Sequence, residues 1–435
     1  AAAGVKYAEN LDFAHNLASY IVYRSESSFY AKNGDTGKID YSGQDAATVI
    51  QNAINALNNG GIIFMKAGAY PLTSVLNVKS GVQIIGEGCS TTLSVGRDVY
   101  GAIKISDARK AQKTRISNLE INGNKRNQTD TTIQTGLITL DTTKEIEEIY
   151  LDRIWFKNAF FCDIVNVGYD HNPKKISITH IRSIDCGDEG SGNAPHSLYL
   201  TNLEDSYIAD YYVCNSYHTS FDIRTKGKRS VFVDLESYSS QGYGMNLYTE
   251  DAICIGCMAI NSNGHGIRLS GCTRTVLLGC VAMNNSKNPS AEEDGILITG
   301  SSNNNTVIGC VSTDNQPSKT QRYGIYLAGD GNIVIGNQLG GNKTDAIFRS
   351  EDTNTILRNN VGYVAEKEGH DNSVSDGGTI MHGLATTPSY VSVTGSVAGE
   401  IVSVTDIDAT NITVAIKKHD GSVGTLQKVY WKASI

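Results

Sequence analysis

One six-residue phrase is repeated along the chain as SLYLTN from Ser197, SFDIRT from Ser220, GMNLYT from Gly244, GIRLSG from Gly266, GILITG from Gly295, GIYLAG from Gly324 and AIFRSE from Ala346. Successive copies start 23, 24, 22, 29, 29 and 22 residues apart. A minimum period of 22 residues with occasional additions indicates one structural unit per period, with the additions placed in loops.

Each phrase alternates apolar and other residues, as a strand with one buried face does. A second phrase lies between the copies, for example AICIGCMAINSNG from Ala252 and NTVIGCVSTDN from Asn305. No helical stretch separates the strands, and the turns are too short and too rich in glycine and asparagine for crossover helices. The repeat therefore predicts an all-β solenoid with three strands per turn, stacked in parallel about 4.8 Å apart. We interpret it as a right-handed parallel β-helix, the hand that parallel crossovers prefer.

The turn between the second and third strands has a constant length. It places Cys257, Cys280, Cys310, Asn337 and Asn359 at equivalent positions, which predicts a column of small or amide side chains that satisfies backbone groups from turn to turn. Insertions instead fall just before the first strand, at 287–294 and 316–323. These insertion loops are expected to lie along the border of the face that the first strands form.

The overall composition is that of an ordinary globular protein, with 435 residues, 19% charged and 40% hydrophobic. A net charge of −8 and the lack of a basic arm argue against nucleic acid as a partner, and no apolar run reaches membrane-spanning length. The chain begins AAAGV, so removal of a secretion signal is one interpretation. Cys254 and Cys257 form a CxxC, but Cys257 is explained by its column, so no zinc site is predicted.

Five segments are expected along the chain. Residues 1–28 carry apolar residues at helical spacing from Leu11 to Ile21, which indicates a helix, a docking segment or an oligomer neck. Residues 29–95 read as a cap of the solenoid, with a helix over 42–57. The β-helix itself spans 96–365, a polar linker 366–376, and a small antiparallel β-domain 377–435.

The capping segment also carries a family resemblance. Its order GDTG from Gly34, AATVIQNAIN from Ala46, AGAYPL from Ala67 and SGVQIIGEG from Ser80 resembles the entry to the pectate lyase-like β-helix superfamily. That superfamily includes polysaccharide lyases, alginate epimerases, glycosidases and viral tailspikes. The resemblance implies an N-terminal helical cap, a compact C-terminal domain and a carbohydrate-active protein that is extracellular (secreted) or on a virion surface. A similarity to secreted β-helix proteins of heat-loving archaea implies heat tolerance.

The alternation turns two residues of each first strand outward, and these form a ladder. Its members are Tyr199 and Thr201, Asp222 and Arg224, Asn246 and Tyr248, Arg268 and Ser270, Leu297 and Thr299, and Tyr326 and Ala328. Such a ladder suits an extended sugar chain, because aromatic rings stack on sugar faces and guanidinium groups grip carboxylates or sulfates. The loop before Ser197 adds Asp188, Glu189 and His196, and His218 and His265 border the same groove.

Two reactions fit these residues. In β-elimination from a uronate, Arg224 or Arg268 would neutralise the carboxylate, Tyr248 or His218 would remove the C5 proton, and Tyr199 would protonate the leaving oxygen, all beside Asp222. Epimerisation needs the same parts. Glycoside hydrolysis needs paired carboxylates, for which Asp222 has Asp188, Glu189 or Glu250 as candidate partners. The ladder is richer in Arg and Tyr than in acids, which favours a lyase.

Substrate binding is assigned to Arg268, Asn246, His196, Asp188, Glu189 and His265. Alginate epimerases carry a Tyr-Gly-x-Asp-Pro-His motif, from which TSFDIR (219–224) and GYDHNP (168–173) both depart. No cofactor is predicted, although Asp185, Asp188 and Glu189 offer a possible calcium site. The expected partner is a polysaccharide, the expected state a monomer or homotrimer, and the alternatives are a tailspike-type glycosidase, a uronate epimerase or a non-catalytic glycan-binding adhesin.

Overall fold

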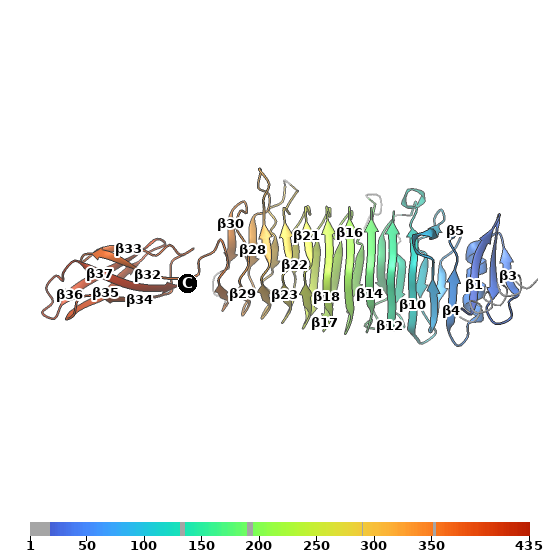
Figure 1. The fold of residues 1–435 in the computed structure, drawn as a ribbon, viewed down its shortest axis with the longest axis horizontal. Coiled ribbons are helices and arrows are strands. Elements are labelled where there is room, and N and C mark those ends of the chain that lie inside the picture. Colours follow the sequence, from blue (N-terminus) through green and yellow to red (C-terminus); the bar gives the residue numbers. More distant parts are fainter. Residues whose placement is uncertain (1–17, 131–134, 189–194, 289, 351–353) are drawn as a thin grey trace, which may run out of the picture.

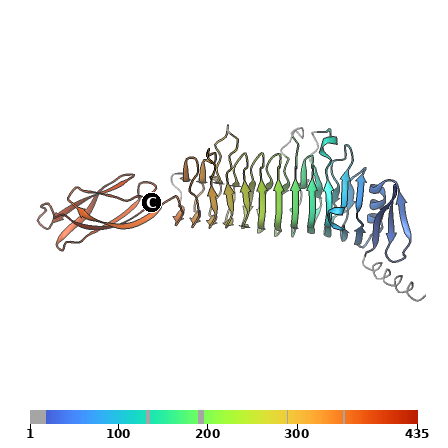
Figure 2. The same cartoon turned by 45° about the horizontal axis from the view of Figure 1, so that its top comes forward.

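The computed structural model describes residues 18–130, 135–188, 195–288, 290–350 and 354–435. Parallel strands stack one behind another along its long axis, as Figures 1 and 2 show from two directions. The seven copies of the repeated phrase lie in a parallel sheet of 11 strands, together with four strands that precede them, and the chain is a parallel β-helix as predicted. These strands are β6 (Leu76–Val78), β9 (Ile103–Ile105), β11 (Gly136–Asp141), β13 (Cys162–Val167), β15 (Leu198–Thr201), β17 (Phe221–Lys228), β19 (Met245–Glu250), β22 (Ile267–Leu269), β25 (Ile296–Ile298), β28 (Tyr323–Leu327) and β30 (Asp345–Arg349).

The second and third strands of each coil, or rung, form the other faces. In the first half they often run together as one bent strand: β10 (Lys110–Asn122), β12 (Glu145–Lys157), β14 (Ser177–Ile184), β16 (Tyr207–Cys214) and β18 (Val231–Tyr238). Later they separate into β20 (Ile253–Ile255), β21 (Met258–Ile260), β23 (Val276–Leu278), β24 (Val281–Met283), β26 (Thr306–Ile308), β27 (Val311–Thr313), β29 (Ile333–Ile335) and β31 (Ile356–Arg358). Parallel pairing continues through both halves.

One residue with positive φ makes the corner between the second and third strands in every rung from β10 onward. Asn118, Arg153, His180, Asp210 and Asp234 occupy it first, with φ between 48° and 55°, and Gly256, Gly279, Gly309, Gly336 and Asn359 follow. A corner of one residue explains why its length never varies.

The residue after the corner forms the predicted buried column, with one correction. Cys257, Cys280, Cys310 and Asn337 are buried there, but the last member is Asn360, because Asn359 is the exposed corner residue. Asn337 accepts from the Cys310 N–H at 2.8 Å and donates to the Val307 carbonyl at 3.1 Å, and Asn360 accepts from Asn337 in turn. The column thus pairs backbone groups that the corner leaves unpaired.

The predicted inward residues form the continuous core. Leu198, Ile223, Leu247, Leu269 and Ile298 are each at most 1% exposed. Apolar burial along the whole stack stabilises the solenoid, because each rung covers its neighbours.

The N-terminal cap contains helix α2 (Ala46–Ala56) and strands β1 (Tyr20–Ser25), β2 (Ser28–Asn33) and β3 (Ile39–Gly43), followed by β4 (Gly61–Met65), β5 (Gly68–Leu72), β7 (Val82–Ile85) and β8 (Thr91–Val95). Asp45 caps α2, accepting from the Thr48 N–H at 3.1 Å, and the helix buries Val49, Ile50 and Ile54. The helix prediction is confirmed, with Ser42 belonging to β3 instead.

The helical interpretation of residues 1–28 is wrong where it can be tested. Ile21 lies in β1, which pairs with β2 and β4 and so continues the sheet. Residues 1–17 lie outside the described residues. No helix in the described parts of the chain has the length and apolar character needed to cross a membrane.

The C-terminal residues form two three-stranded antiparallel sheets. These contain β32 (Glu366–Val374), β33 (Thr379–Met381), β34 (Tyr390–Gly395), β35 (Glu400–Ile407), β36 (Asn411–Lys418) and β37 (Gln427–Ser434) around their own apolar cluster. The linker expected over 366–376 is mostly strand β32, paired with β37. Its polar side chains concealed it, because they are mostly exposed and only the backbone is engaged.

One carboxyl group is enclosed inside the solenoid. Asp163 of β13 is fully buried, whereas the equivalent positions of the next rungs carry Ser197, Ser220 and Gly244. One of its oxygens accepts from the hydroxyls of Ser183 and Ser197. Its other oxygen, Oδ1, has no partner in the described structure. Burial raises the pKa of Asp163 to about 7.

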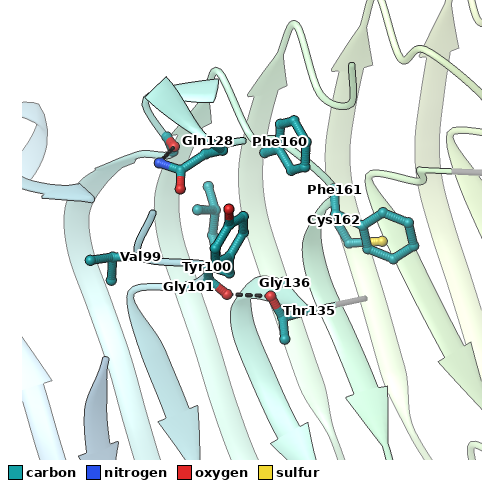
Figure 3. Close-up of a pocket in the computed structure, with 11 residues that line it drawn as sticks. Val99, Tyr100, Gly101, Gln128, Thr135, Gly136, Phe160, Phe161 and Cys162 are labelled. Atoms are coloured by element: carbon teal, nitrogen blue, oxygen red, sulfur yellow. Dashed lines mark hydrogen bonds between the residues drawn. The ribbon is translucent and has the colours of Figure 1, made fainter. Parts of the chain in front are cut away.

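A small cavity opens beside the same strand (Figure 3). Tyr100, Gln128, Phe160 and Cys162 are among its lining residues, and its volume of about 20 Å³ has room for about one water. None of the predicted site residues lines it.

Candidate functional site

Asp222 is the centre of a network on the face formed by the first strands. Its Oδ1 accepts from Asn246 Nδ2 at 2.9 Å, and its Oδ2 accepts from Arg224 Nε at 2.8 Å and lies 3.4 Å from His196 Nε2. Asp222 points away from the core, as expected from the alternation, yet it is only 1% exposed because these neighbours cover it. Burial raises the pKa of Asp222, and Arg224 opposes that rise.

Rings and a guanidinium are layered above this carboxylate. Arg224 Cζ lies 5.4 Å from the centroid of the Tyr199 ring, and the His196 ring stacks on Tyr199 with 5.1 Å between centroids. His218 meets His196 edge-on, also at 5.1 Å. Burial and then the nearby Tyr169 raise the pKa of Tyr199 to about 12, so its hydroxyl stays protonated at neutral pH.

The two histidines are held in their neutral forms. Burial lowers the pKa of His196 well below its ordinary value, and burial followed by Arg224 lowers that of His218. His196 Nδ1 lies 3.2 Å from the Thr219 carbonyl, so this nitrogen carries the proton. His218 Nδ1 is buried with no partner in the described structure, and the neutral His218 ring lies close enough to Arg224 for the guanidinium to lower its pKa.

A second group of residues continues the groove towards the C-terminus. Arg268 Cζ lies 5.3 Å from the Tyr243 ring, which stacks on His265 at 5.4 Å. His265 Nε2 pairs with Glu293, and His265 Nδ1 accepts from the Asp294 N–H at 2.9 Å. Arg268 Nε is buried and has no partner among the described residues, whereas the side chain as a whole is partly exposed, so its guanidinium can bind an anion from the groove.

Asp294 fixes the far end of this group. It forms two 2.9 Å bonds with Arg322, whose guanidinium covers Tyr323 and Tyr326 at 5.0 and 5.2 Å. Tyr326 in turn stacks on Phe348 with 4.6 Å between centroids. The ladder therefore regains aromatic character beyond Leu297.

The structure brings together most of the predicted residues, namely His196, Tyr199, His218, Asp222, Arg224 and Asn246, with Arg268 close enough to act on the charge of Asp222. Tyr248 also points outward, between the buried Leu247 and Thr249. The pairing of β17 with β19 shifts between Ile223 and Gly227, so Tyr248 lies opposite a bulge and packs on Gly271. Alternation alone could not reveal this bulge.

The remaining loop and border residues have separate outcomes. His265 lies in the second group with Glu293, and Glu250 pairs with Lys228 and Arg274 away from Asp222. Asp188 makes interactions of its own, and Glu189 lies outside the described residues. No cluster of metal-binding side chains occurs within the described ranges, which do not include Glu189 of the suggested calcium set.

Several site residues escaped the sequence analysis, and they share a position. Tyr243, Asp294 and Tyr323 each stand immediately before a copy of the repeated phrase, the position that the predicted His196 and His265 also occupy. Gly or Ser turns the chain inward at the next position, which interrupts the alternation. The recurrence of polar and aromatic residues directly before the phrase was the available signal. Tyr169, a neighbour of Tyr199, comes from the GYDHNP loop.

No protein-family model matches the sequence, and no curated protein matches it. Solved structures do match. The tailspike protein gp49 from Pseudomonas phage LKA1 has a TM-score of 0.59 at 10% identity, covering 89% of this chain and 92% of its own. The A-module of the Azotobacter vinelandii mannuronan C-5 epimerase AlgE6 has a TM-score of 0.56 at 16% identity, covering 73% and 95%. The Dettilon tailspike protein gp208 has a TM-score of 0.54 at 13% identity, covering 90% and 91%.

Proposed function

We propose that the protein is an extracellular or virion-surface enzyme that cleaves an acidic polysaccharide, a polyuronate, by β-elimination in the groove of the β-helix. The supporting observation is the placement of a neutral, half-buried histidine, His218, near the Arg224 guanidinium, which lies over the ring of Tyr199, whose hydroxyl stays protonated. The shared fold of a mannuronan C-5 epimerase is compatible with this proposal, since epimerisation also begins at C5 of a uronate.

In the proposed reaction Arg224 binds the substrate carboxylate. Its Nε is engaged by Asp222, which orients the guanidinium and leaves the two terminal amino groups for the substrate. Neutralising the carboxylate stabilises the negative charge that develops when the C5 proton leaves. Arg268, two rungs further along, binds the carboxylate of another sugar residue.

His218 takes the C5 proton, and the electron pair of that C–H bond forms the C4–C5 double bond. The bond from C4 to the glycosidic oxygen breaks, and Tyr199 donates its proton to the departing oxygen. The products are an unsaturated uronate and a shortened chain. Asp222 acts as a positioning residue, because its carboxylate is covered by Arg224 and His196 and cannot reach a sugar directly.

Hydrolysis is less well supported. It requires two carboxyl groups on either side of the scissile bond. Among the described residues, Asp222 is buried and bonded, Asp294 is bound by Arg322, and Glu293 is paired with His265. The geometry therefore favours elimination over paired-carboxylate chemistry.

The test is a screen of polyuronates and neutral glycans that records new reducing ends and the ultraviolet absorbance of unsaturated uronate together. We expect both signals with a polyuronate, and a loss of about 10²–10⁴-fold in kcat for His218→Ala and Tyr199→Phe. Arg224→Ala should abolish discrimination for charged substrates. Reducing ends without the absorbance would establish a hydrolase, a changed C5 configuration without cleavage an epimerase, and tight binding with neither an adhesin.

A matched control is available on another face. Arg115 lies over Tyr150 at 5.5 Å, almost the distance between Arg224 and Tyr199, but on a second strand away from the groove. Arg115→Ala removes an equivalent cation–aromatic contact and should leave activity unchanged. Equal losses in Arg115→Ala and Arg224→Ala would show a general effect of removing such contacts and would contradict the proposed site.

A further inference from the structure

The second strands of the later rungs expose aliphatic side chains to solvent. Their outward positions form two columns that run along the helix axis through β18, β20, β23, β26, β29 and β31. Ile253, Leu278, Ile308 and Ile356 are 39, 42, 37 and 47% exposed. A neighbouring column of Met258, Val281 and Val311 lies across the corner on the third strands and is partly exposed. We call this combined surface the apolar corner.

The same positions in the first half of the helix are different. Arg115, Tyr150, Ser177 and Tyr207 occupy the first column there, in register with the aliphatic residues of later rungs. Both halves have the same strand pairing and the same buried interior, so the fold does not require an aliphatic exterior. Aliphatic side chains at these outward positions add nothing to the packing of the core, and they lower the solubility of the protein because they expose apolar surface.

The corner residue changes in the same rungs. Arg153, His180, Asp210 and Asp234 show that a side chain is tolerated at this positive-φ corner, whereas Gly279, Gly309 and Gly336 replace it later. A Cβ added at any of these three glycines would meet nothing within 4 Å. No other part of the described chain therefore occupies the space that side chains at these three glycines would fill. The glycines flatten the ridge between the aliphatic columns, as a surface in close contact with a partner requires.

The dimensions of the apolar corner suit an interface. Six rungs spaced about 4.8 Å apart, and about seven residues of about 3.3 Å across the corner, give roughly 550 Å². This is near the upper limit for the largest apolar patch of a monomer, and about two thirds of one side of a standard protein interface.

We propose that the apolar corner is a self-association surface on which a second copy of this chain packs side by side with the first. The columns are straight and repeat with the strand spacing, so a complementary surface must repeat with the same spacing over several rungs. A second copy of this chain has the same spacing between its rungs. Symmetric packing of identical patches is also the commonest route to homo-oligomers.

The experiment measures the mass of the full-length protein by sedimentation velocity from about 0.5 to about 50 µM, a range that detects micromolar association. Wild type should sediment as a dimer or larger oligomer at the upper end. The double variant Leu278→Lys/Ile308→Lys should be monomeric at every concentration, because lysine ammonium groups cannot be buried without a partner. Far-ultraviolet circular dichroism confirms that the variants are folded.

Two further variants make the test specific. Ser177→Lys/Thr179→Lys places the same number of charges on one earlier rung, β14, with one lysine in each of the two columns, and should leave association unchanged. Gly279→Asn/Gly309→Asn restores corner side chains of a type that Asn118 and Asn359 already carry, and should weaken association at least tenfold without unfolding. A monomeric wild type at about 50 µM, or an oligomer that survives Leu278→Lys/Ile308→Lys, would overturn the proposal.

Discussion

Asp163 should make the stability of the protein fall as pH rises through the weakly acidic range. Its carboxyl is fully buried, and the pKa of about 7 in the folded protein compares with 3.8 for an ordinary aspartate. The folded state therefore favours the protonated form. The resulting stabilisation is complete below about pH 4 and is lost as pH rises to about 7.

The size of the effect follows from this shift. About three pKa units at about 1.36 kcal/mol each give roughly 4 kcal/mol between the two ends of that range. In Asp163→Asn the amide oxygen can still accept from Ser183 and Ser197. The amide nitrogen takes the place of Oδ1, which has no partner. The nitrogen is then a buried donor without an acceptor, and this lowers the free energy of unfolding by about 1–3 kcal/mol. The variant should thus be more stable than wild type by about 1–3 kcal/mol at pH 8 and less stable by a similar amount at pH 4.

Thermal unfolding followed by circular dichroism at several pH values tests this crossover, with an expected shift of about 2 °C for a protein of this length. Asp141→Asn is the matched control. Burial alone would raise the pKa of Asp141, but its bonds to Lys104 and Thr143 lower it, so this substitution should destabilise the protein at pH 8 and not at acid pH. Parallel pH profiles for wild type and Asp163→Asn would refute the reasoning.

Two other predictions concern the groove and the corner. Since burial and Arg224 lower the pKa of His218 below 6.5, the acid limb of the kcat/KM profile should lie below pH 6.5; a limb at or above that pH would exclude His218 as the base. Asn337→Ala should destabilise the protein by about 1–3 kcal/mol, because it leaves the Cys310 N–H and the Val307 carbonyl unpaired inside the corner; unchanged chemical denaturation would show that water replaces the amide.

The fold could be predicted because the same pattern of strands and corners occurs in every repeat. The inward aliphatic residues, the constant corner and the position of the insertions all follow from one period, and each copy supports the others. The prediction failed where a segment occurs once. Polar strand β32 resembles a linker because its pairing with β37 uses backbone groups, which leave no mark on side-chain pattern.

The candidate site could be predicted only in part, for the same reason. Tyr199, Asp222 and Arg224 obey the alternation, so their common face was accessible from sequence. The burial of Asp222 and the bulge opposite Tyr248 are local departures from the repeat, the first caused by the cover that His196 and Arg224 provide and the second by the extra residues after Ile223. Such departures are specific to one rung and cannot be inferred from the others.

The constant corner has a consequence for how the groove measures a ligand. Because the single-residue corner recurs in every rung, successive strands of the groove follow one another in equal divisions of about 4.8 Å along the helix axis, even beside the bulge after Ile223. The strands of Arg224 and Arg268 are two divisions apart. Adding or removing a whole rung between them would change that separation by one division and leave each arginine's immediate surroundings on its own rung intact. The distance along the helix axis between charged side chains of the groove is therefore a whole number of strand spacings, and the number of repeats between them sets it.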